Sequence, residues 1–155
     1  MAEINRKAGV VWRGDVRNGS GVITTESQAL SEQPFSYQTR FEEKPGTNPE
    51  ELLAAAHAAC FSMALASVIK KKNLNPVEIE TSAVCTLASA GEGFAITRMQ
   101  LRVRGVVPDI DQPAFEQLVK ETNRICPVSN VLREGLEISV EATLVQGVKS
   151  GSPAK

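Results

Sequence analysis

Short runs of alternating apolar and polar residues occupy the first part of the chain, and a long apolar run follows them. The early runs, at positions 8–12, 21–25 and 35–41, are rich in β-branched and aromatic residues and are separated by segments containing Gly, Asn and Asp. Alternation of this kind is typical of half-buried strands, and the separating residues are typical of turns. The first part of the chain is therefore predicted to form a meander of about three strands.

The apolar run at positions 52–69 predicts one long helix. Asn48 can cap its start, Pro49 occupies the first helical position, and Lys70 lies in the last turn, near the negative end of the helix dipole. The run is rich in alanine and is interrupted by a histidine and two serines, so we expect a buried helix and not a membrane span. Because it is apolar on nearly all sides, it is expected at the centre of the molecule or in an interface.

The second half of the chain changes between strand and helix patterns. In order, these predict strands at 78–88 and 94–106, helices at 111–123 and 126–132, and a last strand at 136–145. The alternation in the second of these strands slips once near Thr97. Grouped strands with helices between the groups, in the order βββ-α-ββ-αα-β, predict an α+β fold with antiparallel sheets. We expect residues 1–145 to form a single domain and residues 146–155 a flexible tail.

The composition excludes several classes of function. Seventeen basic residues against eighteen acidic ones give a net charge of −1, which leaves no electrostatic footprint for nucleic acid or an anionic membrane. Aromatic residues make up 5% of the chain, too few for a base-stacking surface. Three cysteines are too few for a disulfide-stapled secreted scaffold, and no signal-peptide pattern opens the chain. We therefore expect a cytoplasmic protein whose thiols are reduced at rest.

The three cysteines differ in their predicted surroundings. Cys60 lies in the middle of the long apolar helix, where a cysteine is either a small buried hydrophobe or a nucleophile. Cys126 precedes Pro127 at the start of a short helix, where the helix dipole favours thiolate over thiol. Cys85 lies in the middle of a strand and is expected to be a packing residue. From these local patterns alone, Cys126 has the better environment for a thiolate.

The only histidine, His57, precedes Cys60 by three residues, so both side chains project from one face of the helix. This spacing leaves open a Cys60/His57 thiol hydrolase, in which the imidazole takes the thiol proton. We favour a core histidine hydrogen-bonded to backbone, because a catalytic imidazole is normally oriented by a third group. One histidine and three cysteines lack the spacing of a zinc site, so no metal is expected.

Two charged residues could support a reactive thiolate. Arg40 is the only cation in the predicted strand at 35–41, where it is either solvated or turned toward a thiolate that it stabilises. Arg17, near a predicted turn, competes for the same role. Glu50 is a carboxylate in the first turn of the long helix, unless it also orients an arginine through a bidentate pair.

Several of these motifs, in this order, resemble the osmotically inducible protein C (OsmC) family. The similarity is carried by Thr39-Arg40-Phe41-Glu42, by the helix from Asn48 through His57-Ala58-Ala59-Cys60-Phe61, and by Cys126-Pro127-Val128-Ser129-Asn130. It extends over almost the whole chain, from Lys7 to Leu144. The sister branch is the organic hydroperoxide resistance (Ohr) proteins, which commonly carry tyrosine where this chain has histidine at position 57. The chain is therefore more similar to the OsmC branch.

The resemblance implies a thiol-dependent peroxidase that reduces organic hydroperoxides and, less efficiently, hydrogen peroxide. In that family pattern Cys60 is the peroxidatic thiol, Cys126 is the resolving thiol, and Arg40 and Glu50 polarise the reactive cysteine. The resemblance implies that the histidine at position 57 is not required for peroxide reduction. The resemblance also implies a lipoyl-type dithiol as reductant, no bound cofactor, and an intertwined homodimer with two long helices at its centre.

Helix geometry constrains where Glu50 can act. Glu50 and Cys60 are ten residues apart on one helix, which is about 15 Å along the axis. The carboxylate therefore cannot touch its own Cys60 thiolate, so either Arg40 bridges the two or Glu50 serves the other subunit. We expect the second arrangement. A non-catalytic dimer that binds an apolar ligand and the Cys60/His57 hydrolase remain as alternatives.

Overall fold

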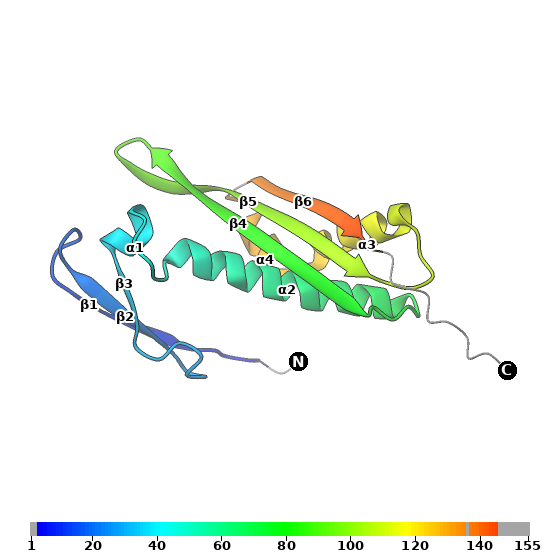
Figure 1. The fold of residues 1–155 in the computed structure, drawn as a ribbon, viewed down its shortest axis with the longest axis horizontal. Helices are drawn as coiled ribbons and strands as arrows, with labels where there is room; N and C mark the ends of the chain where they lie inside the picture. Colours follow the sequence, from blue (N-terminus) through cyan, green and yellow to red (C-terminus); the bar gives the residue numbers. More distant parts are fainter. Residues whose placement is uncertain (1–2, 136, 146–155) are drawn as a thin grey trace. The chain divides into compact units, whose positions relative to one another are not determined.

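The computed structural model describes residues 3–135 and 137–145, and the predicted tail at 146–155 lies outside the described residues. The chain divides into two compact units, Met1–Leu52 and Leu53–Lys155. The elements (Figure 1) are β1 (Ala8–Arg13), β2 (Ser20–Thr25), β3 (Gln33–Ser36), α1 (Tyr37–Phe41), α2 (Pro49–Lys71), β4 (Glu78–Ala90), β5 (Gly93–Val106), α3 (Gln112–Ile125), α4 (Pro127–Leu132) and β6 (Glu137–Leu144). This mixed α+β composition confirms the predicted fold class.

The first unit contains the predicted meander, in which β1, β2 and β3 pair antiparallel in sequence order. The predicted strand at 35–41 is wrong beyond Ser36, because α1 begins there. The Ser36 side chain accepts a hydrogen bond from the Thr39 amide, and the Thr39 hydroxyl accepts one from the Ser36 amide. This capping box satisfies amides at the helix start and turns the chain out of the sheet. Arg40 is therefore a helix residue.

The second unit contains a sheet in the order β4-β5-β6. Figure 1 shows β4 and β5 as a long hairpin with β6 beside β5. The pairing of β4 with β5 shifts register between Thr86 and Leu87, whose partners are Arg98 and Ile96. Thr97 is the extra residue of this bulge. The slip in the alternation near Thr97 is thus explained.

The last strand differs from the prediction in direction. β6 pairs parallel to β5, with Leu101 opposite Val140, so the sheet of this unit is mixed and not wholly antiparallel. Between these strands the chain passes through α3 and α4. A connection of this length carries the chain back to the starting end of the sheet, which allows parallel pairing.

α2 begins as predicted, with the Asn48 side chain accepting a hydrogen bond from the Glu51 amide. By length and composition, α2 is the one described helix that is apolar enough to cross a membrane, and a third of its apolar window is buried in this chain. The buried face packs in the core of the second unit against β5 and α3, through Phe61, Leu65, Val68, Ile69, Leu101, Val103 and Phe115. Met63 on the opposite face is 77% exposed. The described residues of one chain therefore leave most sides of α2 unenclosed.

Candidate active site

The two cysteines of the family motifs lie side by side in the second unit. Cys60, near the middle of α2, is half-buried, whereas Cys126, the residue before α4, is 0% exposed. Their sulfur atoms are 3.5 Å apart, with no bond between them. The structure thus brings together two residues that are 66 positions apart in the sequence. Disulfide formation requires an approach to about 2.05 Å.

The start of α4 contributes to the electrostatic surroundings of Cys60. Burial raises the pKa of the Cys60 thiol, the Val128 backbone N–H lowers it, and the adjacent Cys126 thiol raises it. The Cys126 side chain makes no capping hydrogen bond to α4. The sequence placed Cys126 next to the helix dipole, but it contained no signal that a free amide of this helix faces Cys60. Because the net pKa is raised, Cys60 needs a further positive group to become a thiolate at neutral pH.

His57 is a core residue, as expected, but its predicted backbone partner is wrong. Its Nε2 lies 2.8 Å from the Ser129 Oγ, and both residues are 0% exposed. Among the described residues, Nδ1 has no hydrogen-bond partner. Burial lowers the pKa of His57 below its ordinary value of 6.5, so the ring is neutral at neutral pH. With Nε2 directed at Ser129, the imidazole is not arranged as a general base for Cys60.

The neutral, buried ring predicts a loss of stability in acid. Between the lowered pKa of the folded state and 6.5, the unfolded chain binds a proton at His57 that the folded chain does not bind. The free energy of unfolding should therefore fall as the pH drops through 6.5, by at most about 1.4 kcal/mol per pH unit, and level off below the folded-state pKa. Urea unfolding at several pH values, at fixed protein concentration, measures this slope. His57→Gln should remove the part due to this residue, and an unchanged slope would contradict the assignment.

In the first unit, Arg40 and Glu50 form the bidentate pair that the sequence left open. Arg40 Nε lies 3.2 and 3.1 Å from the two carboxylate oxygens of Glu50, and Nη2 lies 2.6 Å from Oε1. Glu50 is only 7% exposed, so the pair is partly shielded from water. The guanidinium also lies 5.1 Å from the centre of the Phe41 ring. A charge held in this way has little freedom to turn into solvent.

Arg17 and Cys85 are the two remaining residues that the sequence analysis considered. The Arg17 guanidinium lies 5.3 Å from the centre of the Tyr37 ring, where the cation faces an aromatic surface. Cys85 lies in β4, opposite Met99 of β5. In the described part of the chain, no three His, Cys, Asp or Glu side chains group as a metal site.

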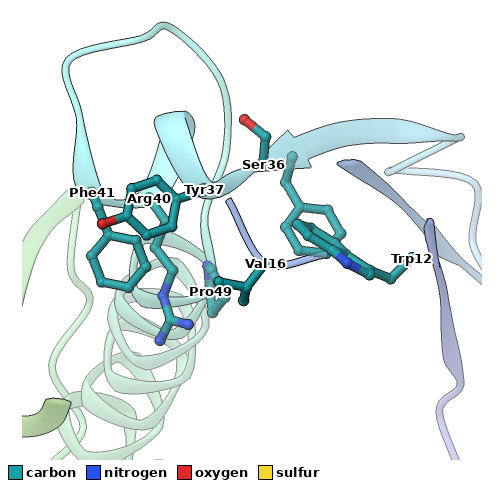
Figure 2. A pocket seen from close by; sticks show the side chains of 8 residues that line it. Trp12, Val16, Ser36, Tyr37, Arg40, Phe41 and Pro49 are labelled. Carbon is teal, nitrogen blue, oxygen red and sulfur yellow. The ribbon is translucent and has the colours of Figure 1, made fainter. Parts of the chain in front are cut away.

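An apolar cavity of about 320 Å³ adjoins Arg40 in the first unit. Figure 2 shows Tyr37, Arg40 and Phe41 of α1 on one side of it and Trp12 of β1 on the other. Its lining is completed by Val16, Phe35, Ser36 and Pro49. Apart from Arg40, the sequence did not indicate that these residues line a common cavity, because they come from separate elements. The cluster of aromatic residues near Arg40 was the available signal.

Comparisons with known proteins agree with the motifs. The family model described as OsmC-like protein matches residues 41–141. Peroxiredoxin OsmC of Escherichia coli (strain K12) is 41% identical over 138 residues, which cover 89% of this chain and 96% of that protein. Organic hydroperoxide resistance protein OhrB of Bacillus subtilis (strain 168) is 32% identical over 123 residues, or 79% of this chain and 88% of that protein.

The fold comparison gives the same result. The crystal structure of OhrB from Bacillus subtilis superposes with a TM-score of 0.70 at 29% identity, covering 88% of this chain and 98% of that one. The family model matches more than half of the chain, and the Escherichia coli relative aligns over almost all of it. The chain therefore belongs to the OsmC-like protein family.

Proposed function

We propose that the chain is a thiol-dependent peroxidase that reduces organic hydroperoxides to alcohols and acts less efficiently on hydrogen peroxide. The observation that carries this proposal is the 3.5 Å separation of the Cys60 and Cys126 sulfur atoms. A peroxidase-type role also follows from the family, because relatives are named peroxiredoxin OsmC and organic hydroperoxide resistance protein. The chain is accordingly a peroxiredoxin-like hydroperoxide reductase.

The reaction needs one thiolate and one second thiol. The Cys60 thiolate attacks the outer oxygen of the hydroperoxide, the O–O bond breaks, and the alkoxide leaves as the alcohol after taking a proton. Cys60 is then a sulfenic acid. The Cys126 sulfur attacks the Cys60 sulfur, the S–O bond breaks, and water leaves as the disulfide forms. Two electrons thus pass from the thiol pair to the peroxide.

Arg40 is the cation that we assign to the activation of Cys60. Burial raises the pKa of Cys60, so an ionised neighbour is needed to favour the thiolate. The Glu50 carboxylate holds the guanidinium in a fixed orientation through three short contacts. Because Glu50 and Cys60 are ten residues apart on α2, we propose that the Arg40–Glu50 pair of one subunit serves Cys60 of the other.

Exposed apolar surface in both units supports the homodimer. The outer face of α2 presents Ala55, Ala59 and Met63 to solvent, and β1 exposes Val10 and Val11. Apolar side chains that gather on the surface of one chain are typical of an interface with another chain. Sedimentation equilibrium combined with an activity assay tests the dimer. A monomer with full peroxidase activity would contradict both the dimer and the shared site.

The cavity beside Arg40 supports an organic substrate. It is lined mainly by apolar side chains, with one charged group at its wall. Such a lining favours a hydroperoxide that carries an alkyl or acyl chain over hydrogen peroxide, which gains nothing from apolar contacts. The resting enzyme would be regenerated by a lipoyl-type dithiol in the cytoplasm. Because Cys126 is 0% exposed, we expect that dithiol to attack the Cys60 sulfur.

A peptide map under non-reducing conditions tests the proposed function directly. The reduced protein is treated with one equivalent of cumene hydroperoxide or, separately, of hydrogen peroxide, and the cysteine peptides are identified by mass spectrometry. We expect rapid formation of a Cys60–Cys126 linkage with the organic peroxide and slower formation with hydrogen peroxide. If both cysteines stay reduced, the protein is not a peroxidase. A binding module for an apolar ligand or a Cys60/His57 hydrolase would then take its place.

A further inference from the structure

Two side-chain contacts of matching spacing join α2 to α4. On α2, His57 and Cys60 are three residues apart, and at the start of α4, Cys126 and Ser129 are also three residues apart. His57 contacts Ser129, and Cys60 contacts Cys126. Residues three apart lie on one face of a helix. The hydrogen bond and the sulfur pair are therefore neighbouring contacts in one interface.

The His57–Ser129 contact is well shielded. Both side chains are 0% exposed, and Nε2 and Oγ are 2.8 Å apart. Water does not reach these groups to replace a lost partner, so each depends on the other for its hydrogen bond. The imidazole is held only through Nε2 among the described residues, because Nδ1 has no partner there.

α4 depends on such contacts for its position. It is six residues long, and an isolated helix of this length is not stable by its own hydrogen bonds. Its first turn nevertheless supplies two groups to Cys60, the adjoining Cys126 thiol and the Val128 amide. Ser129 is the buried residue of this helix. Its hydrogen bond to α2 therefore fixes the turn that carries both groups.

We propose that His57 and Ser129 are positioning residues for disulfide closure. This inference rests on the proposed function and concerns only its second step, in which Cys126 attacks the Cys60 sulfenic acid and water leaves. A second hydroperoxide molecule competes with that step and oxidises the sulfenic acid to a sulfinic acid. The hydrogen bond holds Cys126 within reach of Cys60 and so favours closure over this irreversible product. The first oxidation needs no approach of the two sulfur atoms, so losing the hydrogen bond should slow it less than it slows closure.

Two amide variants at position 57 distinguish the effect of losing the hydrogen bond from the effect of changing the polarity of the side chain. The amide nitrogen of His57→Gln can occupy the position of Nε2 and reach Ser129, whereas the shorter side chain of His57→Asn cannot. Ser129→Ala removes the other partner. Ser62→Ala is the matched control, because the Ser62 hydroxyl also links α2 to another element, through Thr81 Oγ1 of β4 at 2.8 Å, and contacts Ala58 O within α2 at 2.9 Å.

The experiment treats each reduced protein with increasing cumene hydroperoxide, without reductant, and measures disulfide and sulfinic acid by mass spectrometry after alkylation. Stopped-flow fluorescence gives the rate of the first oxidation. We expect His57→Asn and Ser129→Ala to raise the ratio of sulfinic acid to disulfide by about tenfold or more. His57→Gln and Ser62→Ala should match the wild type in this ratio, and the rate of the first oxidation should change less than the ratio in every variant.

Each outcome bears on one proposal. If His57→Asn and His57→Gln both give the wild-type ratio, the positioning role is overturned, and this comparison stands even if Ser129→Ala does not fold. If Ser62→Ala raises the ratio as much as His57→Asn, the effect is one of general packing and the inference also fails. If the wild type forms no disulfide at all, the proposed function fails instead.

Discussion

Replacing Cys60 with serine will abolish hydroperoxide turnover, whereas replacing Cys126 with serine will allow one oxidation and then stop. A serine hydroxyl is not ionised at neutral pH, so Cys60→Ser has no nucleophile for the O–O bond. Cys126→Ser retains the thiol at Cys60 but lacks the sulfur 3.5 Å away that would close the disulfide. Steady-state peroxide consumption with a dithiol reductant measures turnover, and mass spectrometry after a single addition identifies the stalled product.

The stalled Cys126→Ser protein should carry a sulfenic acid or a more oxidised form of Cys60. Cys85→Ser is the matched control, because Cys85 lies in β4 opposite Met99 and takes no part in the proposed cycle. It should turn over at the wild-type rate. Sustained turnover by Cys126→Ser would contradict a two-cysteine cycle, and turnover by Cys60→Ser would remove Cys60 from the chemistry.

Replacing Arg40 with alanine will slow the oxidation of Cys60 much more than it destabilises the fold. An opposite charge near an ionisable group shifts its pKa by about 1–3 units. Its loss should therefore lower the thiolate fraction, and with it the oxidation rate at neutral pH, by about 10- to 1,000-fold. Stopped-flow measurement of the first oxidation over a range of pH tests this, because raising the pH should restore much of the rate.

The Arg40→Ala experiment needs a control for the effect of leaving the Glu50 carboxylate without its ion-pair partner. Glu50 is 7% exposed, so removing Arg40 leaves a carboxylate that is nearly buried and unpaired. The double variant Arg40→Ala/Glu50→Gln removes this charge and should unfold at a temperature closer to the wild type while remaining slow in peroxide reduction. An Arg40→Ala protein with the wild-type rate of oxidation would show that Arg40 has no place in the site.

Local patterns determined much of the fold. The Asn48 cap and the apolar run that follows predict α2 to its first residue, because capping depends on residues within one turn. Alternation predicts β4 and β5, and the slip near Thr97 marks a real bulge. The family motifs point to Cys60 and Cys126 as the candidate cysteines, and the sequence placed Cys126 at the start of a helix, where the structure has it. Each of these features depends on residues close together in the chain.

The tertiary structure decided which distant groups meet. The direction of β6, the effect of the Val128 amide on the Cys60 pKa and the contact of His57 with Ser129 have no local signal. His57 and Ser129 are 72 positions apart, and their approach follows from how α4 packs on α2. Periodicity and capping specify the elements because their energies are local. The pairing of buried polar groups is specified only by packing, since each such group must find a partner among whatever elements the core brings beside it.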